Sequence, residues 1–235
     1  MHAVYYVRPG ENEELRYSLR SLEKNTDVDR VSIIGGYPEW LNLDTTEVLP
    51  GNPHANKQRN GIANMEIAMR EFRGDFLVLN DDFMVLRPME DRLPFYHKHT
   101  LDNHILQAST ATPEGQHRKK MLVQMNLYLK SNRVAVPMSF ETHVPMRVNG
   151  EELSDRVADY REWWGGMNEG EPLMWRSLYA NYKPFSEVEG RRDVITHGVE
   201  SMSLAGDFAS TSDRTVEPIL PLLRERFPTP SRWER

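Results

Sequence analysis

One short segment constrains the fold of this chain more than any other. Residues 76 to 79 read Phe-Leu-Val-Leu, and they run directly into Asn80, Asp81 and Asp82. A short apolar run that ends in turn-forming polar residues is typical of a buried strand in an α/β sheet. Open α/β sheets bind their ligands beyond the carboxyl ends of the strands. The two carboxylates therefore mark the edge at which we expect a functional site.

The residues before this strand alternate between strand and helix patterns. Apolar runs predict strands at 4–7, 31–34 and 46–49, and apolar residues at helical spacing predict helices at 11–25 and 60–73. Asn12 is expected to cap the first of these helices. The order predicts an α/β fold with a central, mostly parallel sheet flanked by helices.

The second part of the chain carries weaker patterns. Helices are predicted at 151–164, 172–182 and 216–226, and loops around short strands are predicted at 187–192 and 201–214. The polar stretch from 110 to 120 has few apolar residues, so we interpret it as a mobile loop.

Composition excludes several classes of protein. The 235 residues include no cysteine, so disulfides, thiolate metal sites and cysteine nucleophiles are excluded. No apolar run approaches the roughly 20 residues that span a bilayer, which predicts no membrane span. The lack of cysteine predicts a reducing, cytoplasmic compartment. A net charge of −6 argues against a nucleic-acid-binding surface, a function that only the basic residues 118–120 would support.

Asp81 and Asp82 are the sharpest chemical signal. Adjacent carboxylates at a strand end supply hard oxygen ligands for Mg²⁺ or Mn²⁺, and such an ion can neutralise a departing pyrophosphate. A solvated turn explains Asn-Asp-Asp equally well when these three residues are considered alone.

Other segments offer groups for phosphate and for proton transfer. Lys57, Arg59 and Asn60 lie near a predicted helix start and suit a phosphate, although a solvated loop explains them too. His143 could act as a general base, although a lone histidine is more often structural. Arg176 offers a planar fork for phosphate.

Aromatic and charged groups on the predicted helices have two interpretations as well. Trp163, Trp164 and Trp175 could form a wall on which a carbohydrate stacks, but adjacent tryptophans also occur in ordinary helix packing. Arg16 and Arg20 share one face of the first helix, where surface ion pairs are the ordinary explanation.

Several of these residues fall in motifs that resemble the Stealth family of sugar-phosphate transferases. The segment 12–23 resembles the second conserved region of that family, 38–42 resembles its Pro-x-Trp-Leu-Asn, and 76–83 resembles its Phe-Ile-Tyr-Leu-Asn-Asp-Asp-Phe. Thr142-His143-Val144-Pro145 and Trp175-Arg176-Ser177 are similar to its third region. Residues 226–234 resemble its fourth region, so the motifs follow the family order over nearly the whole chain.

The resemblance implies a GT-A-like nucleotide-diphosphosugar fold that forms a single catalytic domain over residues 1–235. Within it we expect a donor-binding half at 1–97 and an acceptor-side half at 98–235. Catalytic roles are expected for Asp82, His143 and Arg176, and a Mn²⁺ or Mg²⁺ ion is expected at Asp81 and Asp82. The residues expected to bind the donor are Arg8, Glu14, Arg16, Arg20, Lys57, Arg59, Asn60 and Asn80.

The reaction itself stays open at the level of sequence. Arg8 stands where the family has a carboxylate or an amide, and the segment 57–60 is closer to the donor-binding stretches of ordinary glycosyltransferases. The leading hypothesis is glycosyl transfer from a nucleotide-diphosphate sugar to a protein or glycan acceptor, without nucleic acid as a partner. Transfer of a hexose 1-phosphate and a catalytically inactive carbohydrate- or protein-binding module are the alternatives.

Overall fold

The fold is described from a computed structural model of the chain. It describes residues 1–51, 57–89, 93–165, 172–191, 194–195, 204, 206–212 and 215–235.

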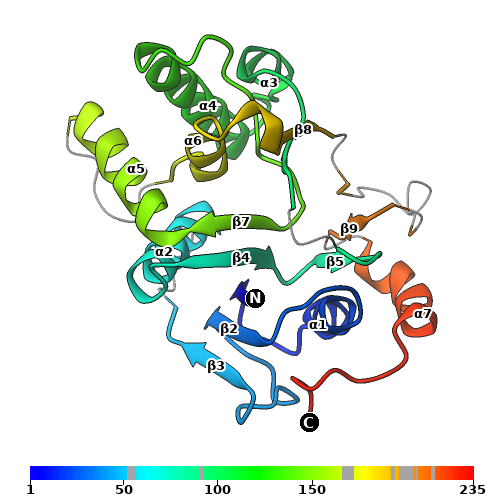
Figure 1. Ribbon diagram of the computed structural model, residues 1–235. Coiled ribbons are helices and arrows are strands. Elements are labelled where there is room, and N and C mark those ends of the chain that lie inside the picture. Colours follow the sequence, from blue (N-terminus) through cyan, green and yellow to red (C-terminus); the bar gives the residue numbers. More distant parts are fainter. Residues whose placement is uncertain are drawn as a thin grey trace.

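A five-stranded sheet forms the centre of the molecule (Figure 1). In spatial order its strands are β3 (Thr46–Leu49), β2 (Arg30–Gly35), β1 (His2–Val7), β4 (Asp75–Asn80) and β7 (Met146–Asn149). The first four strands are parallel, and β7 pairs with β4 in the antiparallel direction. The predicted α/β architecture with a mostly parallel central sheet is therefore confirmed.

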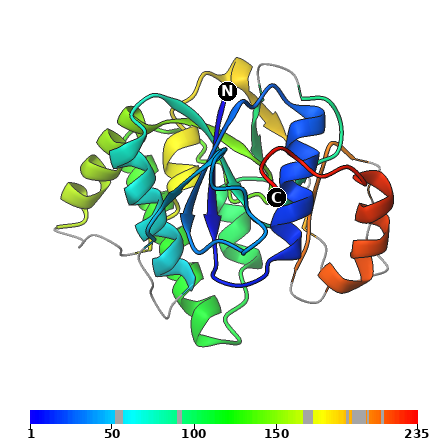
Figure 2. The same cartoon turned by 90° about the horizontal axis from the view of Figure 1, so that it is seen from below.

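Helices flank this sheet on both faces (Figure 2). On one side lies α1 (Glu13–Asn25), with α7 (Val216–Arg226) next to it. On the other side lie α2 (Lys57–Glu71), α4 (Pro113–Ser131), α5 (Gly150–Trp163) and α6 (Trp175–Ala180). Strands covered on both faces need apolar side chains in both directions, which explains the continuous apolar runs in the sequence.

Strand β1 shows how the two cores divide. Ala3, Tyr5 and Val7 pack into the cluster that contains the apolar face of α1, whereas Val4 packs into the cluster beneath α2 and α4. All four side chains are buried. Because successive side chains of a strand point to opposite faces, one short strand contributes to both cores.

The predicted loop at residues 110–120 is wrong, because helix α4 begins there. Thr112 caps this helix by accepting a hydrogen bond from the backbone N of Gly115 at 3.1 Å, and Pro113 follows the cap. This is a favourable helix start. Its apolar residues begin at Met121, so the first two turns give almost no periodic signal.

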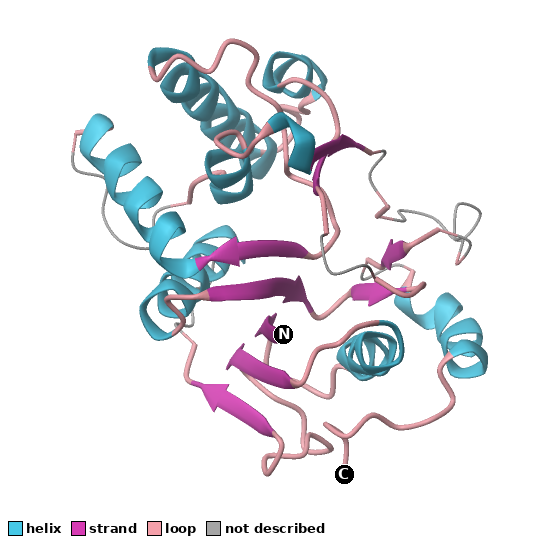
Figure 3. Ribbon diagram, in the orientation of Figure 1, coloured by secondary structure: helices cyan, strands magenta, loops and turns pink. Residues whose placement is uncertain are grey.

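The smaller elements lie around this framework (Figure 3). Two further pairs of strands are β5 (Phe83–Val85) with β9 (Phe208–Ser210), antiparallel, and β6 (Phe95–His97) with β8 (Val188–Gly190), parallel. The remaining elements are α3 (Leu101–Gln107) and the 3-10 helix η1 (Phe185–Glu187). Within the described ranges, none of the helices combines the length and apolar character needed to cross a bilayer.

Candidate active site

The carboxyl ends of β1 and β4 lie side by side at the point where the sheet changes its direction of growth. From β1 the chain adds β2 and β3 on one side, and it then returns to place β4 on the other. Such switch points are where open α/β sheets bind ligands. Arg8 and Asn12 follow β1 here, and Asp81 and Asp82 form the turn between β4 and β5. Asn80 is the last residue of β4 and pairs with Tyr6 of β1.

Polar side chains of α1 hold the strand that follows this turn. Ser18 donates a hydrogen bond to the carbonyl oxygen of Phe83, and Oγ of Ser21 accepts one from the N of Val85 at 2.9 Å. Nδ2 of Asn25 donates to the carbonyl oxygen of Val85 at 2.7 Å. These buried polar residues recur along one face of α1, where they bind the edge of β5 that β9 leaves uncovered. They fix the position of the Asp81–Asp82 turn.

Asp81 is buried and is oriented by Asn12. Oδ2 of Asp81 accepts a hydrogen bond from Nδ2 of Asn12 at 2.7 Å. Asn12 has a φ of 45°, and its Oδ1 accepts from the N of Leu15 at 3.1 Å, so the predicted cap of α1 is confirmed. Burial raises the pKa of Asp81, while the Asn12 hydrogen bond and the charge of Arg8 lower it.

Asp82 accepts a hydrogen bond from a residue of β9, a strand that lies far along the chain. Ser210 donates a hydrogen bond from Oγ to Oδ2 of Asp82, and the next residue, Thr211, donates from Oγ1 to Oε1 of Glu14. The pKa of Asp82 is raised to about 7, chiefly by burial. The Ser210 hydrogen bond lowers this pKa, whereas the charges of Asp81 and Glu14 raise it. We call Glu14, Asp81 and Asp82 the carboxylate cluster.

The carboxylate cluster fits a hard cation that is shared with a ligand. Within the described part of the chain, no group of three or more Asp, Glu or His side chains is placed to hold an ion without help. Mg²⁺ in phosphate-binding sites is commonly held by one or two carboxylates, with phosphate oxygens and water completing the shell. Asp81 and Asp82 match that requirement, and a cation would offset the like charges that raise the pKa of Asp82.

Phe83 brings His143 and Arg176 to the same place. The His143 ring lies edge-on to the Phe83 ring, with centroids 6.3 Å apart, and Cζ of Arg176 lies 5.6 Å from the Phe83 centroid. Nη1 of Arg176 donates to the carbonyl oxygen of Val144 at 2.9 Å, which ties the guanidinium to the residue after His143. Phe83 directly follows Asp82, so His143 and Arg176, which come from distant segments, both contact the residue next to the carboxylate turn.

The start of α2 lies at the same edge of the sheet. A Cβ on Gly51 would lie 2.6 Å from Cα of Gly35, the last residue of β2, so the chain passes tightly against that strand end before α2 begins. Arg59 is exposed and Asn60 is half-buried in the first turn of α2. The side chain of Lys57 lies outside the described residues, and donor binding by these three residues stays a prediction.

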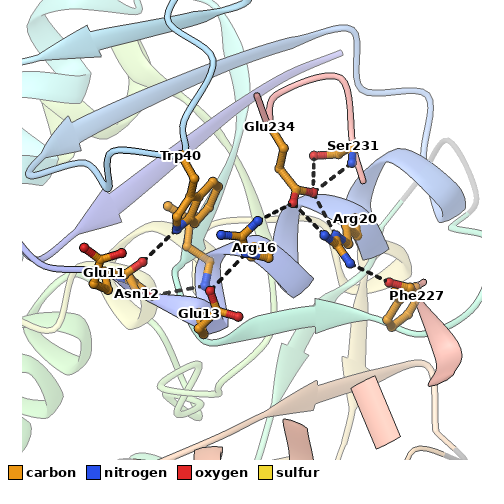
Figure 4. A network of polar contacts seen from close by, with 10 residues as sticks. Glu11, Asn12, Glu13, Arg16, Arg20, Trp40, Phe227, Ser231 and Glu234 are labelled. Atoms are coloured by element: carbon orange, nitrogen blue, oxygen red, sulfur yellow. Dashed lines mark hydrogen bonds and ion pairs between the residues drawn. The ribbon is translucent and has the colours of Figure 1, made fainter. Parts of the chain in front are cut away.

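Arg16 and Arg20, which are predicted to bind the donor, both contact the C-terminal segment (Figure 4). Nη1 of Arg16 lies 3.0 Å from Oε2 of Glu234, and Nη2 of Arg20 lies 2.7 Å from the same oxygen. The Glu234 side chain is only 2% exposed. Residues two apart on a helix project in nearly opposite directions, so Arg16 and Glu14 lie on different sides of α1. These contacts give both arginines a structural role, and donor binding by them stays a prediction.

The same contacts explain much of the motif resemblance. Cζ of Arg16 stacks 4.4 Å above the Trp40 ring, and Nε1 of Trp40 donates to the carbonyl oxygen of Glu11 at 2.8 Å. The segments 12–23, 38–42 and 226–234 thus contact one another in the folded chain, although they are far apart in sequence. Several of the matched residues are accordingly explained by packing rather than by chemistry.

Trp163 and Trp175 lie in different surroundings, one in helix packing and the other beside Arg176. Trp163 lies against Tyr128 and Tyr160, with ring centroids 5.3 Å and 6.2 Å apart, which favours the helix-packing interpretation for it. Trp175 lies beside Arg176, whose Cζ is 5.0 Å from its ring.

Sequence reasoning missed Ser210 and Thr211, the two hydroxyl donors to the carboxylate cluster. They stand at the end of a three-residue strand, too short for a clear alternating pattern. Their partners lie 128 and 197 positions away, so no local signal identifies them.

Comparison with solved structures finds distant similarities, of which two are described. No protein-family model and no curated protein matches the chain. A crystal structure of the galactosyltransferase LgtC with donor and acceptor sugar analogues is 13% identical, covering all of this chain and 85% of that one, with a TM-score of 0.46. A structure of an active-site mutant of LgtC is 11% identical over the same shares of the two chains, with a TM-score of 0.44.

Proposed function

We propose that the chain is a GT-A-like glycosyltransferase that uses a nucleotide-diphosphate sugar as donor and a protein or glycan as acceptor. The observation that carries this proposal is the contact of His143 and Arg176 with Phe83, the residue that follows Asp81 and Asp82 at the switch point of the sheet. Together they offer oxygen ligands for a cation, a planar donor for phosphate and a group that can accept a proton.

On the donor side, the chain would act mainly by positioning charge. Asp81 and Asp82 would hold Mn²⁺ or Mg²⁺, which supplies positive charge against the diphosphate as it departs. Asn12 and Ser210 keep the two carboxylates in place through their hydrogen bonds. Arg176 adds a guanidinium beside the same turn, where its fork suits a phosphate oxygen pair.

On the acceptor side, His143 is the candidate base. The acceptor hydroxyl oxygen forms a bond to the anomeric carbon of the donor sugar while the bond from that carbon to the diphosphate oxygen breaks. The hydroxyl proton passes to His143, and the nucleoside diphosphate leaves with the bonding electrons. The edge contact with Phe83 and the Arg176 hydrogen bond to Val144 hold the histidine segment in place for this transfer.

Transfer of a hexose 1-phosphate is the second candidate. It is favoured by Asn12 and Glu14, because these residues of the segment that resembles the Stealth family contact Asp81 and Thr211 in the site. In that reaction the acceptor oxygen attacks phosphorus, the bond between the two phosphates breaks, and a nucleoside monophosphate leaves.

The identity of the released nucleotide tests the proposal. We would incubate the protein with a panel of labelled nucleotide sugars and Mn²⁺, with and without EDTA, and separate the products by chromatography. Release of UDP or GDP supports glycosyl transfer, and release of UMP or GMP supports sugar 1-phosphate transfer. Binding without release would indicate an inactive binding module and would overturn the enzymatic proposal.

A matched pair of variants tests the site. Asp82→Asn should abolish release of the nucleotide, because it removes the negative charge of one of the two carboxylates proposed to hold the cation. Asp75→Asn is the control, since Asp75 is an exposed residue at the opposite end of the same strand. Equal turnover in the two variants would contradict the assignment of Asp82.

A further inference from the structure

A cavity of about 250 Å³ lies next to the candidate active site. Its walls come from four segments: the start of α2 at Gly61, the first half of α4 at Arg118, the loop residue Glu141, and the stretch that leads into α6 at Trp175. Glu141 stands two residues before His143, and Trp175 directly precedes Arg176. The cavity thus shares chain segments with two residues of the proposed catalytic group.

The guanidinium of Arg176 contacts one residue that lines the cavity and one residue that follows the carboxylate turn. Its Cζ lies 5.0 Å from the ring of Trp175, which lines the cavity, and 5.6 Å from the ring of Phe83, which follows Asp82. Arg176 therefore links the wall of the cavity at Trp175 to the segment that follows the proposed metal ligands.

The floor of the cavity is apolar and fixed. Ile62, Met121 and Leu173 line it, and they are 3%, 5% and 7% exposed as members of the core beneath α2 and α4. Such a floor suits an apolar surface of the ligand, but it does not by itself specify one.

Three polar groups on the cavity walls have hydrogen-bond donors or acceptors that are not used within the described part of the chain. Oε1 of Glu141 accepts hydrogen bonds from N and Oγ of Ser177 at 3.1 and 2.9 Å, which locks this carboxylate, while Oε2 has no hydrogen-bond partner among the described residues. The Arg118 guanidinium and the indole N–H of Trp175 also lack a hydrogen-bond partner within the described ranges. The site therefore presents one fixed acceptor and two donors around an apolar floor.

This combination matches a sugar ring better than other small ligands. A hydroxyl group can donate to Glu141 and accept from Arg118, whereas a carboxylate only accepts and a guanidinium only donates. A phosphate would be repelled by the fixed carboxylate, and a hydrocarbon chain would leave both charges without partners. The volume is below the roughly 300–1,000 Å³ of pockets for drug-sized ligands, which fits one ring rather than an oligosaccharide.

We propose that this cavity is a subsite for a single pyranose ring, with Glu141 and Arg118 binding its hydroxyl groups and Trp175 contacting its apolar face. The inference rests on the proposed function, because it assigns the ring to the same reaction. The ring could belong to the acceptor or to the sugar of the donor, and the two sources share this chemistry.

Binding measurements that need no turnover test the subsite. Ligand-detected NMR would follow methyl pyranosides of the common hexoses with the wild-type chain, Arg118→Met, Glu141→Gln and the control Lys120→Met, which alters an exposed cation of α4 outside the cavity. Glutamine can still accept from Ser177, so Glu141→Gln should keep the local structure. We expect at least one pyranoside to bind, with its Kd raised fivefold or more in the first two variants and unchanged in the control.

A second titration, with nucleotide sugar and with the same nucleoside diphosphate alone, identifies the source of the ring. If the two variants weaken binding of the nucleotide sugar but not binding of the nucleoside diphosphate, the ring is that of the donor. If they weaken only the free pyranoside, it is that of the acceptor. The proposal is overturned if no pyranoside binds, or if Lys120→Met weakens binding as much as the cavity variants. If only the proposed function is wrong, the pyranosides still bind as expected but the protein does not turn over any nucleotide sugar. The two failures are therefore distinguishable.

Discussion

Asn12 donates a hydrogen bond from Nδ2 to Oδ2 of Asp81 at 2.7 Å while its Oδ1 caps α1 by accepting from the N of Leu15 at 3.1 Å. One amide therefore begins a helix and orients a carboxylate of the candidate site. The two contacts use different atoms, so substitutions at this position can separate them.

Asn12→Ser and Asn12→Ala should differ in stability but not in activity. Serine can cap a helix and alanine cannot, so we expect the serine variant to be more stable by about 1 kcal/mol. Both lose the amide donor to Asp81, and we expect both to lower turnover about tenfold, equivalent to about 1.4 kcal/mol. Urea unfolding and nucleotide-release assays measure the two effects. The left-handed φ of 45° at this position is unfavourable for serine and alanine alike, so the comparison between them isolates the cap. Equal stability of the two variants would contradict the capping role.

Arg176→Lys tests the shape of the cation rather than its charge. Lysine keeps a positive charge but loses the planar fork and the fixed hydrogen bond to Val144, so phosphate and the His143 segment would both be misplaced. We expect turnover to fall about 100-fold, the scale on which catalysis responds to a displacement of about 1 Å. Arg147→Lys serves as the control, because Arg147 is a half-exposed arginine that pairs with Glu187. Wild-type activity in Arg176→Lys would refute the role of the fork.

Glu234→Gln should destabilise the fold without altering the chemistry. The amide leaves Arg16 and Arg20 without the buried negative charge that they share. Because both arginine side chains are partly exposed, we expect a loss of about 1–3 kcal/mol in the free energy of unfolding, less than for a fully buried pair. Glu151→Gln breaks an exposed pair with Arg73 and should cost less than about 0.5 kcal/mol. Equal urea midpoints for the two variants would show that the Glu234 contact adds little.

His2 should make the protein less stable in mild acid. Burial lowers the pKa of His2 to about 4, and the charge of Arg30 lowers it too. The unfolded chain has the ordinary histidine pKa of about 6.5, so between these values the unfolded state binds a proton that the folded state does not. The free energy of unfolding therefore falls as the pH drops from about 7 towards 4.

His2→Gln removes this titration and isolates its effect. We expect the difference in unfolding free energy between wild type and variant to shrink by about 1–2 kcal/mol between pH 7 and pH 5, with allowance for solvent screening. Denaturant titrations of both proteins at the two pH values measure it. A difference that stays constant would show that His2 does not titrate in this way.

The central sheet could be predicted from sequence because its strands carry their own signal. Apolar runs at β1, β2, β3 and β4 are bounded by turn residues, and the helices between them have apolar residues at regular spacing. In these elements the apolar residues that form the sequence pattern are also the residues that the fold buries. Helix α4 was missed because its burial begins two turns after its cap, so capping chemistry was the available signal and hydrophobic periodicity was not.

The candidate site was predictable in part. Asp81 and Asp82 stand out because two carboxylates follow a buried strand. Their partners Ser210 and Thr211 depend on how β9 pairs with β5, a tertiary fact with no local trace. The structural role of Arg16 and Arg20 could not be predicted for a related reason, because sequence shows a cation but not the residue that neutralises it, which here is Glu234.

The Glu234 contact also has a consequence for how the protein is made. Arg16 leaves the ribosome 218 residues before its partner, which at about 5–20 residues per second corresponds to about 10–40 s of synthesis. Throughout that interval α1 carries two guanidinium groups without the carboxylate that pairs with them in the finished fold. The first helix of the nascent chain thus reaches its final environment only when residues near position 234 have been translated.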